Sequence, residues 1–442
     1  MNCYDRHYLK IALPAALEGL FMILLASTDL ILVGALGSLS VAAVSIFLQP
    51  RLILLCFSRS LASAVTLAAC NHAGSGDRER SADLLKKSLV IGALLMGVLH
   101  VLFFYFLEDI FLLMGASADY LSLAMEYGPM ALLAVYFTSL TLILQAVLLG
   151  YGDTSSIMKT NISGNLLNAC LSFVLIRGLG PVPAFGVAGA AFGTAAGTLF
   201  SLLYSYYLLE REGFFHGGRW MPDRAYFKKV GPLFASVLSE QGSERIGMVL
   251  FSRMAAGLGT VPFAVHSICM NICDVYYDFI MGFGKAGMVT AGQAVGRGSM
   301  ADWHHYRRTG LFWCLILSTA ACGITLAFAH PIFVFYSPDP SLLPLASVIM
   351  VFIAFVSYPE ALALWGAGIL RGSGQTAQVA AYSFVSITFL RPLVTAFFIY
   401  GLDMGLVGTW CALFLDQVIR ASCASFLVNR LAVKRGFLPD AA

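Results

Sequence analysis

Long apolar segments recur along the whole chain, each long enough to cross a lipid bilayer, and short polar connections separate them. A helix needs about 20 apolar residues to cross the hydrocarbon core. Breaks at charged residues and at Gly or Pro predict twelve spans, at residues 11–36, 44–70, 88–114, 122–148, 160–178, 187–209, 230–256, 263–292, 309–335, 344–370, 378–400 and 406–430. Because the hydrophobic fraction of 59% exceeds what one water-soluble core buries, we predict an all-α integral membrane protein.

Basic residues occupy alternate connections between these spans. Five odd-numbered connections contain no Lys or Arg, namely 37–43, 115–121, 257–262, 336–343 and 401–405. The even-numbered connections are basic and hold Arg78, Arg80, Lys86, Lys87, Lys159, Arg211, Arg219, Arg224, Lys228, Lys229, Arg297, Arg307, Arg308 and Arg371. Positive residues favour the cytoplasmic side. We therefore predict a multi-pass protein of the cell inner (plasma) membrane with both termini in the cytoplasm.

Several other function classes are disfavoured by the sequence. It contains no HExxH, GxSxG or GxxxxGK[ST] motif, so we expect neither an enzyme nor an ATP-driven pump, and no bound cofactor. The net charge of only +3 argues against a nucleic-acid partner. Energy for any transport would come from an ion gradient.

The two halves of the chain share a sequence pattern. The run that begins at Tyr8 recurs at Tyr226, and after a small insertion residues 150–154 match residues 372–376. Since each half holds an even number of spans, both halves insert with the same orientation. This predicts two pseudo-symmetric six-helix bundles. The predicted domains are an N-terminal bundle at 1–210, a cytoplasmic linker at 211–229 and a C-terminal bundle at 230–442.

Residues within the spans follow the same repeat. The shift that matches residues 150–154 with residues 372–376, here called the repeat shift, also pairs polar residues at matching depth: Glu18 with Glu240, Gln49 with Asn271, and Tyr136 with Tyr358. A glycine also recurs at every fourth position of the sixth span, at Gly189, Gly193 and Gly197. This spacing lets helix backbones approach closely, so we predict tight helix packing there.

Polar residues of the first half are candidates for an ion site. Asp29 lies in the middle of the first span, and Asn165 and Asn168 lie three apart on one face of the fifth. A carboxylate within the membrane is costly and persists when it faces protein, water or a partner. One carboxylate and two amides could bind a hard monovalent cation or a proton. The alternative is a hydrogen-bond network that only packs the helices.

The second half contains five carboxylates within its spans: Glu240, Glu244, Asp274, Asp278 and Glu360. We predict an acidic cavity in which burial and mutual repulsion create a proton-exchanging group, with Glu240 and Glu360 as the first candidates. The alternative is a buried ion pair with an arginine. Asp416 and Arg420, one turn apart, are expected to pair locally, with Arg391 as a second possible partner.

Other polar and aromatic side chains in the spans are candidates for the lining of a substrate cleft. These are Gln49, Tyr136, Glu244, Asn271, Asp274, Asp278 and Tyr358. Acidic and aromatic groups together suit flat organic cations. The predicted partners are therefore small-molecule organic cations and the lipid bilayer, and we expect a monomer.

Several motifs in order resemble those of the multidrug and toxic compound extrusion (MATE) family, and the resemblance covers nearly the whole chain. The first-half motifs are Ile11 to Ala15, Thr28 to Gly34, Gln145 to Asp153, Asn165 to Asn168, and Gly186 to Ala190. The second-half motifs are Glu240 with Gln241, Ala256 to Thr260, Gly292 to Gly296, and Gly368 to Gly372. Two positions depart from the family pattern. Leu149 stands before Gly150 where Arg is usual, and Ser172 stands where one branch carries an acidic residue.

The resemblance implies a secondary active antiporter that exports drugs or metabolites by alternating access in exchange for H⁺ or Na⁺. It carries over Asp29 as the first-half cation residue, and Glu240 and Glu360 as the acids of the seventh and tenth spans. A Na⁺ ion would bind at Asp29 or Glu240. One alternative is a flippase for lipid-linked oligosaccharide from the same superfamily, which would favour a basic cleft. Another is a non-transporting membrane receptor, which has no need of duplicated acids at mid-membrane.

Overall fold

The protein is helical throughout the part of the chain that the structure, a computed structural model, describes. That part comprises residues 2–178, 183–337 and 339–434, without the side chains of residues 24–31 and 434. The helices of the first half are α1 (Cys3–Gly34), α2 (Ser38–Ser45), α3 (Leu48–Ser75), α4 (Arg78–Tyr105), α5 (Leu107–Leu113), α6 (Ala118–Gly150), α7 (Thr154–Arg177) and α8 (Gly186–Arg211).

The second half repeats this order. Its helices are α9 (Arg224–Ala256), α10 (Thr260–Arg297), α11 (Met300–Ala327), α12 (Ala329–Tyr336), η1 (Pro340–Leu342), α13 (Leu343–Gly372), α14 (Thr376–Ser383), η2 (Phe384–Leu390), α15 (Arg391–Ala396), η3 (Phe397–Gly401) and α16 (Gly405–Lys434). The repeat shift moves the bounds of α4 onto those of α11, and the end of α3 onto that of α10. The sequence repeat is therefore also a repeat of helix bounds.

Capping side chains explain several helix starts. Asp77 accepts a hydrogen bond from the backbone amide of Arg80, and Asp153 accepts one from Ser156, so α4 and α7 begin with some of their free amide groups satisfied. Helix α4 begins before the predicted third span, because its charged first turns extend the helix beyond the apolar segment.

Eight of the described helices or helix pairs are apolar and long enough to cross a membrane. Helices α7, α9 and α10 are long, but they fall outside this set because polar and charged side chains interrupt their apolar sequence. These three helices carry most of the candidate site residues. The polar and charged side chains of the candidate site, which are costly to place within a membrane, are thus concentrated on a few helices.

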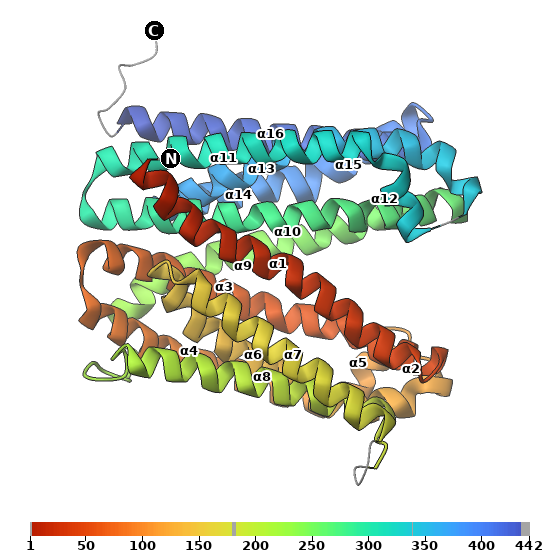
Figure 1. Cartoon of the computed structure of the whole chain (residues 1–442), viewed down its shortest axis with the longest axis horizontal. Coiled ribbons are helices and arrows are strands. Elements are labelled where there is room, and N and C mark those ends of the chain that lie inside the picture. Colours follow the sequence, from red (N-terminus) through yellow and green to blue (C-terminus); the bar gives the residue numbers. More distant parts are fainter. Residues whose placement is uncertain (1, 179–182, 338, 435–442) are drawn as a thin grey trace. The chain divides into compact units, whose positions relative to one another are not determined.

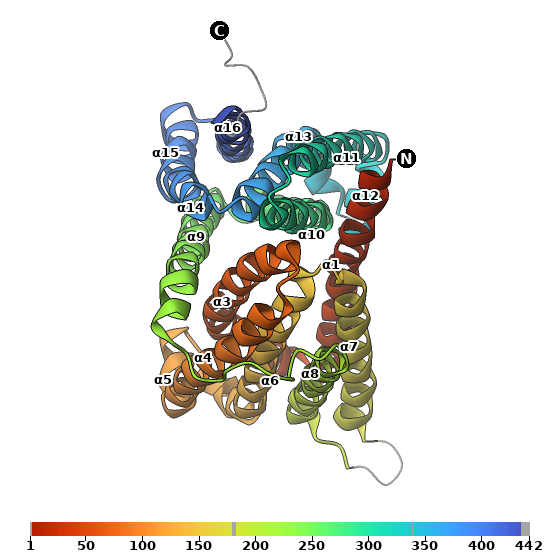
Figure 2. The same cartoon turned by 90° about the vertical axis from the view of Figure 1, so that its left-hand side faces the viewer.

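Contacts divide the chain into two compact units. One comprises Leu17–Phe234 and is here called the N-terminal bundle; the other comprises Met1–Ala16 with Ala235–Ala442 and is called the C-terminal bundle. In the C-terminal bundle, α13 packs against α10, α11 and α16, which run side by side in Figure 1. In the N-terminal bundle, α8 packs against both α6 and α7, as the end-on view in Figure 2 shows.

The first turns of α1 and of α9 each pack with the other half of the sequence. The hydroxyl of Tyr8 donates a 2.6 Å hydrogen bond to the carbonyl of Phe283 in α10. The hydroxyl of Tyr226, its counterpart in the repeat, donates a 3.0 Å bond to Oγ of Ser88 in α4. The division by contact therefore differs from the domain boundaries predicted at residues 210 and 230, because the first turns of α1 and α9 are each buried by the opposite half.

The predicted linker is attached to the N-terminal bundle. Arg78 pairs with Glu212 at 2.9 Å, and Lys87 pairs with Asp223 at 2.9 Å. The ammonium of Lys87 holds the pKa of Asp223 below its usual value of 3.8. Two ion pairs thus fasten the segment after α8 to the first turns of α4.

Glycines allow the close packing of α7 and α8. A Cβ atom at Gly193 would lie 2.8 Å from the backbone nitrogen of Ser172, and one at Gly189 would lie 2.7 Å from the backbone of Leu175. Neither position has room for a larger residue. The prediction of tight packing at this glycine repeat is confirmed.

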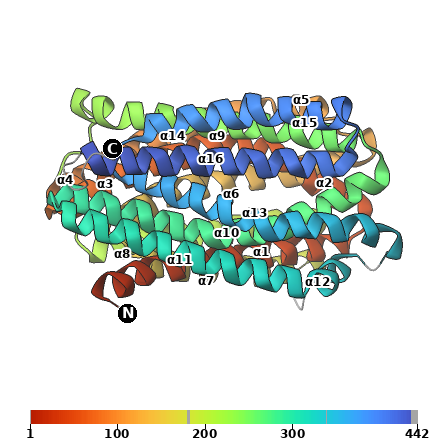
Figure 3. The same ribbon diagram turned by 90° about the horizontal axis from the view of Figure 1, so that it is seen from above.

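The eleventh span differs from its first-half counterpart. Helix α7 is regular, whereas the corresponding segment passes from α14 through the π-helical turns η2 and η3. Figure 3 shows α14 and α15 beside α16, which both contact. Such turns within helices often accompany functional sites.

Candidate ion-coupling site

The five predicted second-half carboxylates lie on three helices of the C-terminal bundle. Glu240 and Glu244 are on α9, Asp274 and Asp278 are on α10, and Glu360 is on α13. They differ in burial: Glu240 and Glu360 are buried, Glu244 and Asp278 are half-buried, and Asp274 is exposed within the described chain. Burial and neighbours therefore give each carboxylate a separate environment.

Glu360 is a buried carboxylate with an unsatisfied oxygen. It follows Pro359 in α13 and is 4% exposed. Its Oε2 has no hydrogen-bond partner among the described residues. The charges that act on it are those of Asp274, Arg420 and Arg391. A buried carboxylate oxygen without a partner favours uptake of a proton or another cation, because desolvation disfavours the charged form.

Glu240 is neutralised by an arginine. Its Oε1 accepts a 2.5 Å hydrogen bond from the guanidinium of Arg371 at the end of α13 and a 3.2 Å bond from the hydroxyl of Ser383 in α14. The guanidinium thus places an opposite charge directly beside the carboxylate. Glu240 thus has the environment of the buried ion pair that was the alternative to a proton-exchanging role.

A second buried ion pair lies in the same bundle. Asp416 of α16 accepts bonds from the guanidinium of Arg391, with a distance of 3.0 Å from Nε, and from the hydroxyl of Ser386. The expected local pair with Arg420 is not formed among the described ion pairs. Packing of α15 on α16 brings Arg391 to the aspartate, so the long-range partner replaces the local one.

The remaining second-half candidates lie at separate places on α10 and α13. The amide of Asn271 is exposed and donates to the backbone carbonyl of Ser267 at 2.7 Å. The hydroxyl of Tyr358 donates to Oγ1 of Thr319 at 3.1 Å. Among the described residues, no group of three His, Cys, Asp or Glu side chains could hold a metal ion.

The first-half candidates are described only in part. The side chain of Asp29 in α1 lies outside the described residues. On α7, Asn165 donates a 2.8 Å bond to the carbonyl of Asn161. Asn168 is buried and accepts a 3.0 Å bond from the hydroxyl of Ser172. Asn168 thus contributes to the interface of α7 with α8, where Ser172 also lies.

The two first-half cleft candidates lie elsewhere in the N-terminal bundle. Gln49 is exposed in the first turn of α3. The hydroxyl of Tyr136 in α6 donates to the carbonyl of Ala93 in α4 at 3.3 Å, and its ring meets the imidazole of His100 edge-on. Tyr136 therefore packs between α6 and α4.

A polar cluster of the N-terminal bundle was not among the predicted site residues. Glu18 of α1 accepts a hydrogen bond from the side-chain amide of Asn161, whose Oδ1 accepts a 2.8 Å bond from the amide of Gln145. Gln145 also donates to Oγ of Ser205 at 3.3 Å. The sequence signal for this cluster was the repeat itself, since Glu18 corresponds to Glu240.

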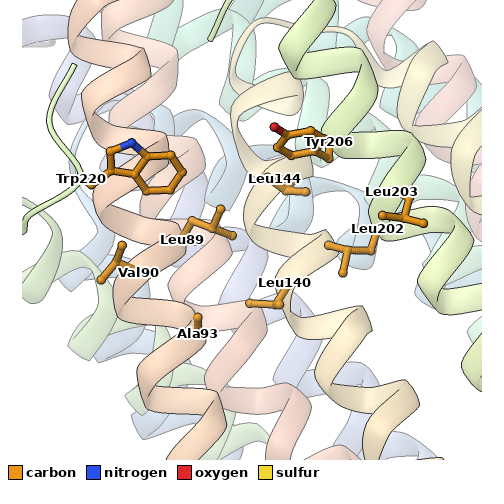
Figure 4. Close-up of a pocket in the computed structure, with 9 residues that line it drawn as sticks. All are labelled: Leu89, Val90, Ala93, Leu140, Leu144, Leu202, Leu203, Tyr206 and Trp220. Carbon is orange, nitrogen blue, oxygen red and sulfur yellow. The ribbon is translucent and has the colours of Figure 1, made fainter. Parts of the chain in front are cut away.

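An apolar groove of the N-terminal bundle contains none of these groups. It has a volume of about 430 Å³ and is lined by Leu89, Val90, Ala93, Leu140, Leu144, Leu202, Leu203, Tyr206 and Trp220. Figure 4 shows these side chains on α4, α6, α8 and the segment that follows α8. The lining contains no carboxylate or amide side chain, so this groove is not the candidate ion site.

Comparison with protein families identifies the family of this chain. The MatE family profile matches residues 14–174 and 232–397, one segment in each half. The chain belongs to the MatE family. MatE membership identifies it as a membrane transporter and not an enzyme, in agreement with the sequence prediction.

Named relatives of this MatE protein are similar along nearly their whole length. The probable multidrug resistance protein NorM of Rhizobium meliloti (strain 1021) is 25% identical over 448 residues, which cover 97% of this chain and 93% of that protein. The multidrug resistance protein MdtK of Pectobacterium atrosepticum is 24% identical over 432 residues, which cover 95% of this chain and 93% of that protein.

Solved structures share the fold. The crystal structure of MATE in the bent conformation has a TM-score of 0.89 at 20% identity and covers 98% of this chain and 96% of its own. The outward-facing structure of a multidrug resistance MATE family transporter of the MOP superfamily has a TM-score of 0.88, also at 20% identity, and covers 98% of this chain and 97% of its own. The predicted all-α, twelve-helix MATE fold is confirmed.

Proposed function

We propose that this MatE protein exports small organic cations across the cell inner membrane by antiport with H⁺ or Na⁺. The observation that carries the proposal is the buried carboxylate of Glu360, with one oxygen unsatisfied, inside a transporter bundle. The multidrug resistance names of its relatives support the substrate class. The alternating basic connections support cytoplasmic termini. The proposed transporter works as a monomer and needs no cofactor other than its coupling ion.

Antiport requires a group that binds either the coupling ion or the substrate, but not both at the same time. A carboxylate that binds H⁺ or Na⁺ loses its charge and with it the attraction for an organic cation. Each ligand shifts the conformational equilibrium only by its difference in affinity between the two states. The membrane potential contributes about 2.3 kcal/mol per charge per 100 mV. Glu360 has the burial and the free oxygen that such a group needs.

The test is ethidium efflux from proteoliposomes under separately imposed H⁺ and Na⁺ gradients. Wild-type protein is compared with Glu360→Gln, which keeps the side-chain volume and removes the charge. Glu79→Gln, an exposed carboxylate in the first turn of α4, is the matched control.

Two results support the proposal together: wild type and Glu79→Gln export ethidium under one gradient, and Glu360→Gln does not. The effective gradient names the coupling ion. Export that is unchanged in Glu360→Gln, or no export of any organic cation by wild type under either gradient, contradicts the proposal. The second outcome makes the flippase the next function to test.

A further inference from the structure

The apolar groove of the N-terminal bundle is open on one side. Leu203, Tyr206 and Trp220, which line it, are exposed, whereas Leu144 on α6 is buried. Beyond the groove, α4 continues with further exposed apolar side chains such as Val98. Exposed apolar side chains on membrane-spanning helices face the hydrocarbon of the bilayer. The groove is therefore accessible to lipid acyl chains.

The groove follows three helices near one end of the bundle, as Figure 4 shows. Each helix supplies side chains about one turn apart: Leu89 and Ala93 on α4, Leu140 and Leu144 on α6, and Leu202 and Tyr206 on α8. These positions lie near the start of α4 and the ends of α6 and α8, beside the segment 212–223 that follows α8. An apolar groove that follows helix axes suits a linear hydrocarbon chain.

Three aromatic rings lie at this end of the groove. The ring of Phe215 is 4.6 Å from that of Tyr206 and stacks on that of Trp220 at 6.1 Å. The segment that carries Phe215 and Trp220 is packed closely on α4, because a Cβ atom at Gly218 would lie 2.7 Å from Oδ1 of Asp83. Trp and Tyr are typical of the boundary between hydrocarbon and lipid headgroups. The rings therefore mark the end of the groove at which a headgroup would lie.

Two basic groups lie beside these rings. The ammonium group of Lys86 on α4 donates to the carbonyl of Gly217 and lies 5.8 Å from the centroid of the Trp220 ring. Lys86 is buried, whereas Arg219, which precedes Trp220, is exposed. No ion pair of the described residues includes Lys86 or Arg219. Their charges are therefore available to attract an anion.

Acidic groups at this end of the bundle have cationic partners. Glu212 pairs with Arg78 at 2.9 Å, and Asp83 and Asp223 both pair with Lys87. The end of the groove therefore favours a negative group and disfavours an organic cation. A ligand with an apolar chain and an anionic headgroup matches both the groove and the charge at its end.

The groove is a feature of one half of the repeat. The repeat shift moves Leu144 onto Gly366 and Leu202 onto Ala424. A Cβ atom at Gly366 would lie 2.7 Å from the Cβ atom of Ala424. Helices α13 and α16 thus meet closely at the positions where α6 and α8 carry leucines that line the groove. The groove therefore depends on the sequence of the N-terminal bundle and does not follow from the repeated fold alone.

We propose that the groove binds one acyl chain of an anionic phospholipid, whose phosphate group contacts Arg219 and is attracted by the buried charge of Lys86. The bound lipid touches both α4 and the segment after α8, so it stabilises the attachment of that segment to the bundle. The site is independent of the transported substrate and of the coupling ion.

The test uses lipids with brominated chains, which quench tryptophan fluorescence on contact. The full-length protein is reconstituted in bilayers of equal parts phosphatidylglycerol, which is anionic, and phosphatidylcholine, which is zwitterionic. Bromine is carried by the chains of one lipid or of the other. The difference between each protein and the same protein with Trp220→Phe gives the quenching at Trp220, which lines the groove.

Two variants change the site, and a third is the control. Arg219→Gln removes the exposed charge, and Ala93→Phe fills the groove between α4 and α6. Arg308→Gln is the matched control, because it makes the same change at an exposed arginine of α11, the position to which the repeat shift moves Lys86.

Brominated phosphatidylglycerol is expected to quench Trp220 more strongly than brominated phosphatidylcholine. Loss of one basic residue should lower this preference about fivefold in Arg219→Gln. Ala93→Phe should abolish the preference, and Arg308→Gln should keep that of the wild type.

Equal quenching by the two lipids in the wild type would mean unselective boundary lipid, and quenching by neither would mean another occupant, such as a second copy of this chain. Either result overturns the proposal. A preference that is unchanged in Arg219→Gln, or that falls equally in Arg308→Gln, also overturns it. If Ala93→Phe does not fold, Arg219→Gln decides the question, because its side chain is exposed.

Discussion

The two buried ion pairs of the C-terminal bundle predict an order of stability losses. Arg391 and Asp416 are 4% and 1% exposed, whereas Arg371 and Glu240 are 28% and 8% exposed. Removal of one partner of a buried pair costs about 3–5 kcal/mol, because the remaining charge has neither water nor a counter-ion. We expect Arg391→Leu to lie at the upper end of this range.

Arg371→Leu should cost less, about 3 kcal/mol or below, because water already reaches this pair. In addition, the hydroxyl of Ser383 still donates to Glu240 after the arginine is removed. Replacement of both partners by leucine removes the unpaired charge as well. The double variants should therefore be more stable than the corresponding single arginine variants.

The assay is equilibrium unfolding in mixed micelles with increasing dodecyl sulfate, followed by tryptophan fluorescence. Four of the five tryptophans report on the C-terminal bundle: Trp303, Trp313, Trp365 and Trp410. An equal or larger loss for Arg371→Leu than for Arg391→Leu would refute the argument from burial. Double variants as unstable as the single ones would refute the argument from an uncompensated charge.

Three further predictions concern packing, pH and a buried hydrogen bond. Gly193→Val should give little monodisperse protein on size-exclusion chromatography, because the side chain would overlap the backbone of α7; Gly231→Ala, where an added Cβ has no atom within 4 Å, should be tolerated. The ammonium of Lys87 holds the pKa of Asp223 below 3.8, so the stabilisation by this pair is present above pH 3.8 and is lost as the pH falls through the lower folded-state value. Protection of residues 212–223 against hydrogen exchange, relative to the intrinsic exchange rate at each pH, should fall in that acidic range, and in Asp223→Asn it should already be low above that range; protection that is insensitive to both changes would contradict the role of the pair. Tyr8→Phe should lower the free energy of unfolding by about 1 kcal/mol, because a buried backbone carbonyl of α10 loses the hydroxyl that donates to it in addition to the helical amide; an unchanged unfolding midpoint would argue against that bond.

The sequence predicts the architecture well because the relevant signals are local. Apolar length decides which segments span the bilayer, and the repeat shift relates the halves without any knowledge of their packing. The glycine spacing of α8 likewise predicts close helix contact, because the small residues all lie on one helix face. The candidate carboxylates of α9, α10 and α13 can also be found from the sequence, because a charged residue inside an apolar segment is a local signal.

The sequence by itself thus determined the spans, the repeat and the set of acidic residues. Only the tertiary structure decided which acid is neutralised, because the partner of a carboxylate comes from another helix whose position and rotation the local sequence does not specify. Glu240 meets Arg371, and Glu18 meets Asn161, each across more than a quarter of the chain. The same reason explains why Asp416 pairs with Arg391 on a neighbouring helix while Arg420 lies one turn away on its own. In a membrane protein the charge state of a site is set by such contacts between helices.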